Sequence, residues 1–231
     1  EKSDSTKTNF LAQMSHEIRT PLNALMNYIS LLRDEIGDDT TEDTDMIFEG
    51  ISNAGSRIIR TIELILNASE LQAGAYSSIK KRINLYDDVV VKVRNDLKHL
   101  AEYKGLDFRI SCLAEDATVE CDAYSVYQSV INIADNSIKY TEKGKIDIRI
   151  LRNENSKLIL EIEDSGIGIA DEYIDHIYEA FSQEEAGYTR RFEGTGLGLA
   201  IVKKYSELNN IQILLHSEKG KGTKFTLVFN E

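Results

Sequence analysis

The chain has 231 residues, of which 42% are hydrophobic and 29% charged, so it can form one large domain or two small ones. No apolar run approaches the roughly 20 residues that span a bilayer, and we expect no membrane contact by this segment. A net charge of −12 argues against nucleic acid as the main partner, and only two cysteines, Cys112 and Cys121, indicate a reducing cytoplasm with buried thiols.

Two helical repeats occupy the first third of the chain. Apolar residues alternate at spacings of three and four, which is typical of a helix-bundle seam. The first seam comprises Leu11, Ile18, Leu22, Leu25, Ile29, Leu32 and Ile36. The second lies between about Thr44 and Ala73 and comprises Ile47, Ile51, Ala54, Ile58, Ile62 and Ile65. A polar loop at 37–43 joins the helices into a hairpin, and pairing with a second copy would complete a four-helix bundle.

After a linker near 74–78, strands and helices mix without regular alternation. We expect strands near 83–85, 106–112, 118–122, 146–150, 158–162, 211–216 and 223–229. We expect helices near 86–103, 123–140, 172–178 and 197–208. The predicted fold is α+β, with an N-terminal helical hairpin followed by an α/β sandwich whose mixed sheet has helices on one face. The expected boundaries are 1–76, a linker at 77–82, and 83–231.

His16 combines a nucleophile with neighbours that can activate it. It falls between seam positions, so it faces away from the bundle core. The adjacent Glu17 can accept from one ring nitrogen and leave the other free to attack. Thr20 lies one turn away on the same face, and Pro21 loosens the helix beside the histidine. An ordinary surface histidine and a tolerated bend are the alternatives.

A second polar cluster lies on one face of the expected helix 123–140. Asn132, Asn136, Lys139 and Tyr140 stand at positions i, i+4, i+7 and i+8. Amide oxygens suit a hard cation, a lysine suits phosphate, and an aromatic ring can lie near a base. Mg²⁺ takes few protein ligands, so one asparagine with phosphates would suffice. The alternative is a solvated polar face.

Two glycine-containing segments complete the candidate site. Asp164-Ser165-Gly166-Ile167-Gly168 directly follows an expected strand, and its glycines allow a ligand to approach the backbone. Asp164 could accept a hydrogen bond from an exocyclic amine such as that of adenine, although a tight turn is the alternative. Gly194-Thr195-Gly196-Leu197-Gly198 opens a helix, whose free N–H groups and positive dipole end attract phosphate. It lacks the ending of a P-loop.

Together these clusters resemble the sensor histidine kinases of two-component systems, whose ATP-binding fold is shared by gyrase, Hsp90 and MutL. The resemblance covers residues 9–230 and most resembles the hybrid class, which carries a receiver domain downstream. Its histidine, asparagine, phenylalanine and two glycine boxes correspond to 10–23, 132–140, 178–181, 164–168 and 194–198. The chain departs from the usual pattern at Asp135-Asn136-Ser137, where an alanine normally follows the asparagine; we expect little effect.

The resemblance implies a dimerisation and phosphoacceptor domain at 1–76 and an ATP-binding domain at 83–231. His16 would accept the γ-phosphoryl group, with Glu17 as general base, and Thr20 would place the water that later hydrolyses the phosphohistidine. Asn136 would ligate Mg²⁺. The other residues implied in nucleotide binding are Asn132 and Lys139 on phosphates or metal, Tyr140 beside the base, Asp164 on the adenine amine, and Gly166, Gly168, Gly194, Thr195, Gly196, Leu197, Gly198 and Thr223.

The implied partners are a second copy of the chain and a response-regulator receiver domain, separate or fused. The implied location is the cytoplasm, including the cytoplasmic part of a membrane-anchored sensor. Two alternatives stay open: an inactive dimeric scaffold that keeps nucleotide, and an ATPase or serine-directed kinase on the same fold. The intact His16–Glu17 pair and Asn136 argue against the scaffold.

Overall fold

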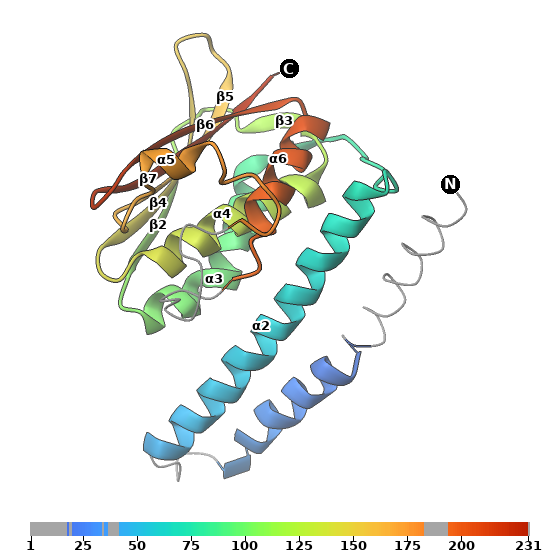
Figure 1. The fold of residues 1–231 in the computed structure, drawn as a ribbon, viewed down its shortest axis with the longest axis vertical. Coiled ribbons are helices and arrows are strands. Elements are labelled where there is room, and N and C mark those ends of the chain that lie inside the picture. Colours follow the sequence, from blue (N-terminus) through green and yellow to red (C-terminus); the bar gives the residue numbers. More distant parts are fainter. Residues whose placement is uncertain (1–17, 19, 34, 37–41, 183–193, 231) are drawn as a thin grey trace. The chain divides into compact units, whose positions relative to one another are not determined.

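The computed structural model describes residues 18, 20–33, 35–36, 42–182 and 194–230. The chain divides into two compact units, Glu1–Tyr76 and Ser77–Glu231, which are drawn in Figure 1. Within the described ranges, no helix combines the length and the apolar character needed to cross a membrane.

The first unit is helical. Residues 20–33 form a helix, and α2 spans Glu42–Gln72. Gly55 of α2 is buried against Met26, and a Cβ at this glycine would overlap the methionine sulfur. The helices therefore approach closely at a point where glycine costs helix propensity. A second apolar surface is exposed in the single chain and includes Leu25, Leu31, Leu32, Ile47, Ile51, Ile58 and Ile65.

The junction between the units is short and fixed at both ends. After α2, the backbone N–H groups of Ala73, Gly74 and Ala75 donate to carbonyls of the last helical turn. In the second unit, the backbone N–H of Ile79 donates to the buried carboxylate of Asp122 at 2.7 Å. Strand β1 then begins at Lys81, inside the expected linker 77–82.

The second unit contains a mixed five-stranded sheet with the order β2-β4-β5-β7-β6. Its strands are β2 (Asp107–Cys112), β4 (Lys145–Arg152), β5 (Leu158–Asp164), β6 (Ile211–Glu218) and β7 (Gly222–Phe229). Strands β2 and β4 are parallel and the other neighbours are antiparallel. Strand β1 (Lys81–Asn84) pairs with β3 (Thr118–Cys121) in a separate antiparallel ribbon.

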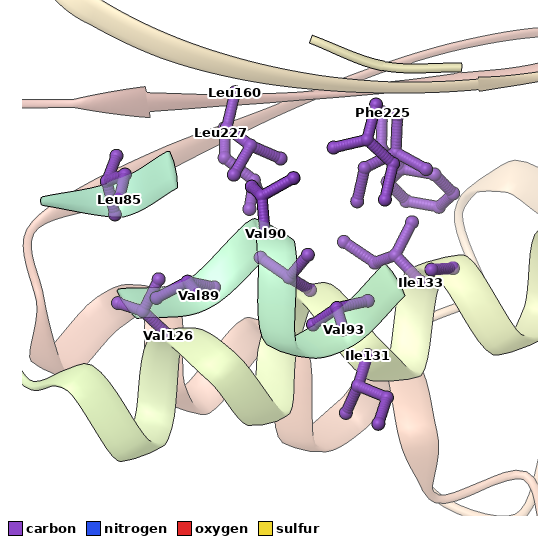
Figure 2. Packing of buried hydrophobic residues seen from close by; sticks show 14 of the residues in the cluster. Leu85, Val89, Val90, Val93, Val126, Ile131, Ile133, Leu160, Phe225 and Leu227 are labelled. Atoms are coloured by element: carbon purple, nitrogen blue, oxygen red, sulfur yellow. The ribbon is translucent and has the colours of Figure 1, made fainter. Parts of the chain in front are cut away.

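Helices cover one face of this sheet, as Figure 1 shows. They are α3 (Val91–Tyr103), α4 (Ala123–Tyr140) and α6 (Gly198–Leu208), and a π-helical turn at Tyr86–Val90 precedes α3. In Figure 2, sheet residues such as Leu160 and Phe225 point toward Val90 and Ile133 of the helical layer, and all four are buried. This apolar interface fixes α4 against the sheet, so the polar residues of α4 are held in place.

Two local expectations are corrected by the structure. The helix expected at 172–178 is shorter, because α5 spans only Asp171–Ile174. After α5, the backbone N–H of His176 donates to the Tyr173 carbonyl, and that of Glu179 donates to the His176 carbonyl. Hydrogen bonds between residues three apart form tight turns, whereas an α-helix joins residues four apart. Of the two thiols expected to be buried, only that of Cys121 is, and burial raises its pKa to about 12. Cys112 is exposed at the end of β2.

Candidate nucleotide-binding site

Asp164 lies at the end of β5, where three elements meet. One carboxylate oxygen accepts from the backbone N–H groups of Gly166 (3.0 Å) and Thr223 (3.2 Å), and the other accepts from the Ser137 hydroxyl (2.9 Å). Burial raises the pKa of Asp164, while the hydrogen bonds from Gly166, Ser137 and Thr223 act in the opposite direction. The residue keeps partial exposure, so this oriented carboxylate can accept a further N–H from a ligand.

The glycine turn after Asp164 is packed too tightly for side chains. A Cβ at Gly166 would lie 2.6 Å from the carbonyl oxygen of Tyr140, at the end of α4. Gly168 has a φ of +64°, and a Cβ there would overlap the Glu218 carbonyl in β6. The Ile167 N–H donates to the Tyr140 carbonyl at 3.1 Å. The glycines therefore hold the turn against α4, which brings Asp164 to the asparagine-containing helix.

Helix α4 connects the turn to the start of α6. At its N-terminus, Asp122 accepts from the Ser125 N–H and caps the helix. Asn132 is buried, and a Cβ at Gly198 would lie 3.6 Å from its amide oxygen. Asn136, Lys139 and Tyr140 follow toward the glycine turn and are partly exposed. The structure thus places the asparagine box between the two glycine boxes.

The cationic and aromatic members of this cluster contact each other. The Lys139 ammonium lies 4.5 Å from the centre of the Tyr140 ring and 3.0 Å from its hydroxyl oxygen. A cation over a ring face is held by electrostatic attraction. The long lysine side chain is flexible enough to exchange this contact for a phosphate oxygen.

The second glycine box forms the entry to α6. Leu197 begins this entry, and its N–H donates to the Thr195 hydroxyl at 3.3 Å. Within the described residues, no side chain caps the N-terminus of α6, so its backbone N–H groups are available to an anionic ligand. The Phe181 N–H donates to the Gly196 carbonyl at 3.0 Å. A backbone hydrogen bond therefore connects the phenylalanine box to the second glycine box.

Thr223 and Gly222 complete the site from β7. The Thr223 hydroxyl lies 2.9 Å from that of Ser217, and its N–H is one of the donors to Asp164. Gly222 approaches the Asp164 carbonyl so closely that a Cβ would overlap it. Both residues hold β7 against the turn that carries Asp164.

Lys104 is a part of the site that motif analysis missed. Its ammonium donates to the carbonyls of Ile138 (2.6 Å), Lys139 (3.0 Å) and Thr141 (2.9 Å). These carbonyls end α4, where a cation both satisfies free acceptors and opposes the negative end of the helix dipole. Burial lowers the pKa of Lys104, and the nearby Glu142 acts in the opposite direction. The sequence does not reveal this contact, because Lys104 follows α3 and its acceptors lie 34 to 37 residues later, at the end of α4.

Replacing Lys104 by methionine is expected to destabilise the second unit by about 1–2 kcal/mol, because it leaves the α4 carbonyls without their donor. Lys104→Arg is the matched control, since it keeps a cation at the helix end. Thermal unfolding measures both variants. Equal destabilisation by arginine and methionine would contradict the capping role.

The phosphoacceptor candidates lie in the other unit. His16 and Glu17 fall outside the described residues. Thr20 is described, and it is exposed at the start of the helix 20–33. The proposed roles of these three residues therefore depend on the sequence pattern.

Two family matches cover most of the chain. Residues 6–74 match the His Kinase A (phospho-acceptor) domain, and residues 121–231 match the Histidine kinase-, DNA gyrase B-, and HSP90-like ATPase. These matches assign different families to the helical unit and to the unit that contains Asp164.

Individual relatives align with almost the whole chain. The autoinducer 2 sensor kinase/phosphatase LuxQ of Vibrio vulnificus is 32% identical over 98% of this chain and 27% of its own length. The hybrid signal transduction histidine kinase B of Dictyostelium discoideum is 32% identical over 98% of this chain and 12% of its length. The chain thus spans about a quarter or less of these two relatives.

A solved structure shares the fold. Full-length ShkA, crystallised in complex with AMPPNP, superposes with a TM-score of 0.69 at 24% identity, covering 96% of this chain and 45% of ShkA. Three observations agree: the helical first unit, the mixed sheet of the second unit, and the matches to both families. The chain belongs to the sensor histidine kinases, with a phosphoacceptor domain followed by a gyrase- and HSP90-like ATPase domain.

Proposed function

We propose that this chain uses MgATP to phosphorylate His16 and then passes the phosphoryl group to an aspartate of a response-regulator receiver domain. The observation that carries the proposal is the Asp164 carboxylate, oriented by three donors at the meeting point of β5, α4 and β7. It is suited to accept from the amine of adenine. The relatives named as kinases support the proposed kinase activity.

In this proposal, different residues contact the base, the phosphates and the metal of MgATP. Asp164 accepts from the adenine amine, Tyr140 packs beside the base, and the free N–H groups at the start of α6 donate to phosphate oxygens. Lys139 adds a positive charge. Asn132 and Asn136 have the amide oxygens that Mg²⁺ accepts as ligands, and Asn136 is the proposed direct ligand. When bound, the metal would neutralise charge on the phosphates.

The phosphoryl transfer itself needs the other domain. Glu17 accepts the proton from one ring nitrogen of His16, and the opposite nitrogen attacks the γ-phosphorus. The bond from this phosphorus to the β,γ-bridging oxygen breaks, and ADP leaves. The phosphoryl group is later transferred to a receiver carboxylate, or to a water held by Thr20. Residues 1–76 are thus the proposed phosphoacceptor domain, 83–231 the ATP-binding domain, and 77–82 the linker.

The exposed apolar surface of the helical unit supports a homodimer. Leu25, Leu32, Ile51 and Ile58 are each more than 40% exposed in the single chain. Such a surface at heptad spacing is typical of a helix that packs against a partner. A second copy of the hairpin would bury it in a four-helix bundle, and we place this assembly in the cytoplasm.

Incubation of the full chain with γ-labelled ATP and Mg²⁺ tests the function. We expect label that is lost in acid, retained in base and mapped to His16. His16→Ala should remove the label and leave ATP affinity within about twofold, because the histidine and the nucleotide site belong to different units. Acid-stable label on a serine would instead support the serine-kinase alternative. ATP binding without any label would support the inactive scaffold.

A further inference from the structure

Ser137 uses its hydroxyl in a way that is unusual for a serine inside a helix. Serine in a helix commonly donates to the carbonyl four residues earlier, and Ser129 of α4 does so, to Ser125 at 2.9 Å. Ser137 lies two turns further along the same helix and is only 3% exposed. Its hydroxyl instead donates to Asp164, 27 residues away, at 2.9 Å.

This bond holds the oxygen of Asp164 that the backbone does not. Gly166 and Thr223 donate to Oδ1, whereas Ser137 donates to Oδ2. Backbone donors persist in any variant that keeps the fold. The serine is the donor that a substitution can remove, and without it Oδ2 loses the partner that fixes the plane of the carboxylate.

The orientation matters because hydrogen bonds weaken steeply away from linearity. A carboxylate that is free to turn presents its lone pairs to an incoming N–H only part of the time. Burial also raises the pKa of Asp164, which works against the charged form that accepts with both oxygens. The hydroxyl of Ser137 opposes both effects.

We propose that Ser137 is a positioning residue for base recognition, whose hydroxyl holds the Asp164 carboxylate in the orientation that accepts the exocyclic amine of adenine. The inference rests on the proposed ATP-dependent function. It attaches a function to the departure from the usual alanine at this position, which motif comparison alone treats as having little effect. The preference of this chain for adenine over a purine without the amine then depends on Ser137.

The test compares Ser137→Ala with Ser129→Ala in the full chain. Both changes remove one buried hydroxyl from α4, but only the first removes a contact to Asp164. Dissociation constants are measured for ATP and for purine riboside triphosphate, which lacks the exocyclic amine. We expect Ser137→Ala to weaken ATP binding about 5- to 30-fold and to change the affinity for the amine-free analogue by less than about twofold. Ser129→Ala should leave the ratio of the two constants unchanged.

Three results would overturn the inference. Equal weakening of both nucleotides by Ser137→Ala would indicate general damage to the site, and unchanged or tighter ATP binding would show that the hydroxyl does not assist Asp164. A change of ratio in Ser129→Ala as large as that in Ser137→Ala would remove the specificity of the contact. If the parent chain does not bind ATP, the proposed function itself fails, and this outcome is distinct from the other three.

Discussion

Replacing Gly222 by alanine is expected to destabilise the ATP-binding unit by about 3–5 kcal/mol. Gly222 has a φ of +117°, which side-chain-bearing residues rarely adopt, and a Cβ there would overlap the Asp164 carbonyl oxygen and lie 3.0 Å from the Ser165 Cα. These are backbone atoms of the turn that carries Asp164, the residue proposed to bind adenine. They cannot move aside without disturbing the pairing of β5 with β7, where Thr223 is opposite Asp164.

Gly220→Ala is the matched control two residues away. Gly220 also has a positive φ, of +82°, but nothing lies within 4 Å of the position that an alanine methyl would take. Its cost is therefore limited to backbone conformation, about 1–2 kcal/mol. Thermal unfolding of the full chain should be followed at the transition that shifts when ATP is added, because this transition belongs to the nucleotide-binding unit. Similar shifts in the two variants would contradict the tight packing at Gly222.

Glu17→Ala and Thr20→Ala are expected to have different effects on autophosphorylation and on dephosphorylation of the receiver partner. Removal of a general base typically costs about 10²–10⁴ in rate, so Glu17→Ala should lose autophosphorylation by this factor. Thr20→Ala should keep autophosphorylation and lose dephosphorylation of the receiver partner, because its hydroxyl does not act on the imidazole and can hold a water near the phosphohistidine or near an aspartyl phosphate docked there. The measurements are uptake of label from ATP and release of phosphate from a phosphorylated receiver domain.

Folding controls are needed, because Thr20 precedes Pro21 and could simply support a bend. Circular dichroism and the mass of the assembly should match the parent for both variants. The separation of roles is wrong if a folded Thr20→Ala chain loses kinase activity as severely as Glu17→Ala. A parent chain without phosphatase activity would also exclude the role of Thr20.

Helix α4 shows how far local sequence predicts the fold. The sequence predicts a helix at 123–140, and α4 spans Ala123–Tyr140, because Asp122 is an N-cap residue and the apolar spacing ends where Gly144 precedes a strand. Which strands pair is harder to predict from the sequence. The parallel β2–β4 pair and the separate β1–β3 ribbon join segments more than 30 residues apart, and no local pattern specifies which strands meet.

The candidate site divides in the same way. Asn132, Asp164 and Gly198 are identifiable from motifs, and the structure brings them onto adjoining elements. The roles of Lys104 and Ser137 could not be predicted. Lysine after α3 has the pattern of a solvated helix end, and serine within α4 resembles Ser129, which bonds to its own helix. Their contacts depend on tertiary distance, which composition and spacing do not encode.

The junction after α2 acts as a very short tether. The last N–H bound to that helix belongs to Ala75, and the first one anchored in the ATP-binding unit belongs to Ile79. The four peptide steps between them reach roughly 13–14 Å at full extension. In the proposed function, a linker this short sets the effective concentration at which nucleotide bound by the second unit meets the phosphoacceptor helices. A transfer within one chain would then not depend on protein concentration, whereas a transfer across a dimer would decrease as dilution dissociates the dimer.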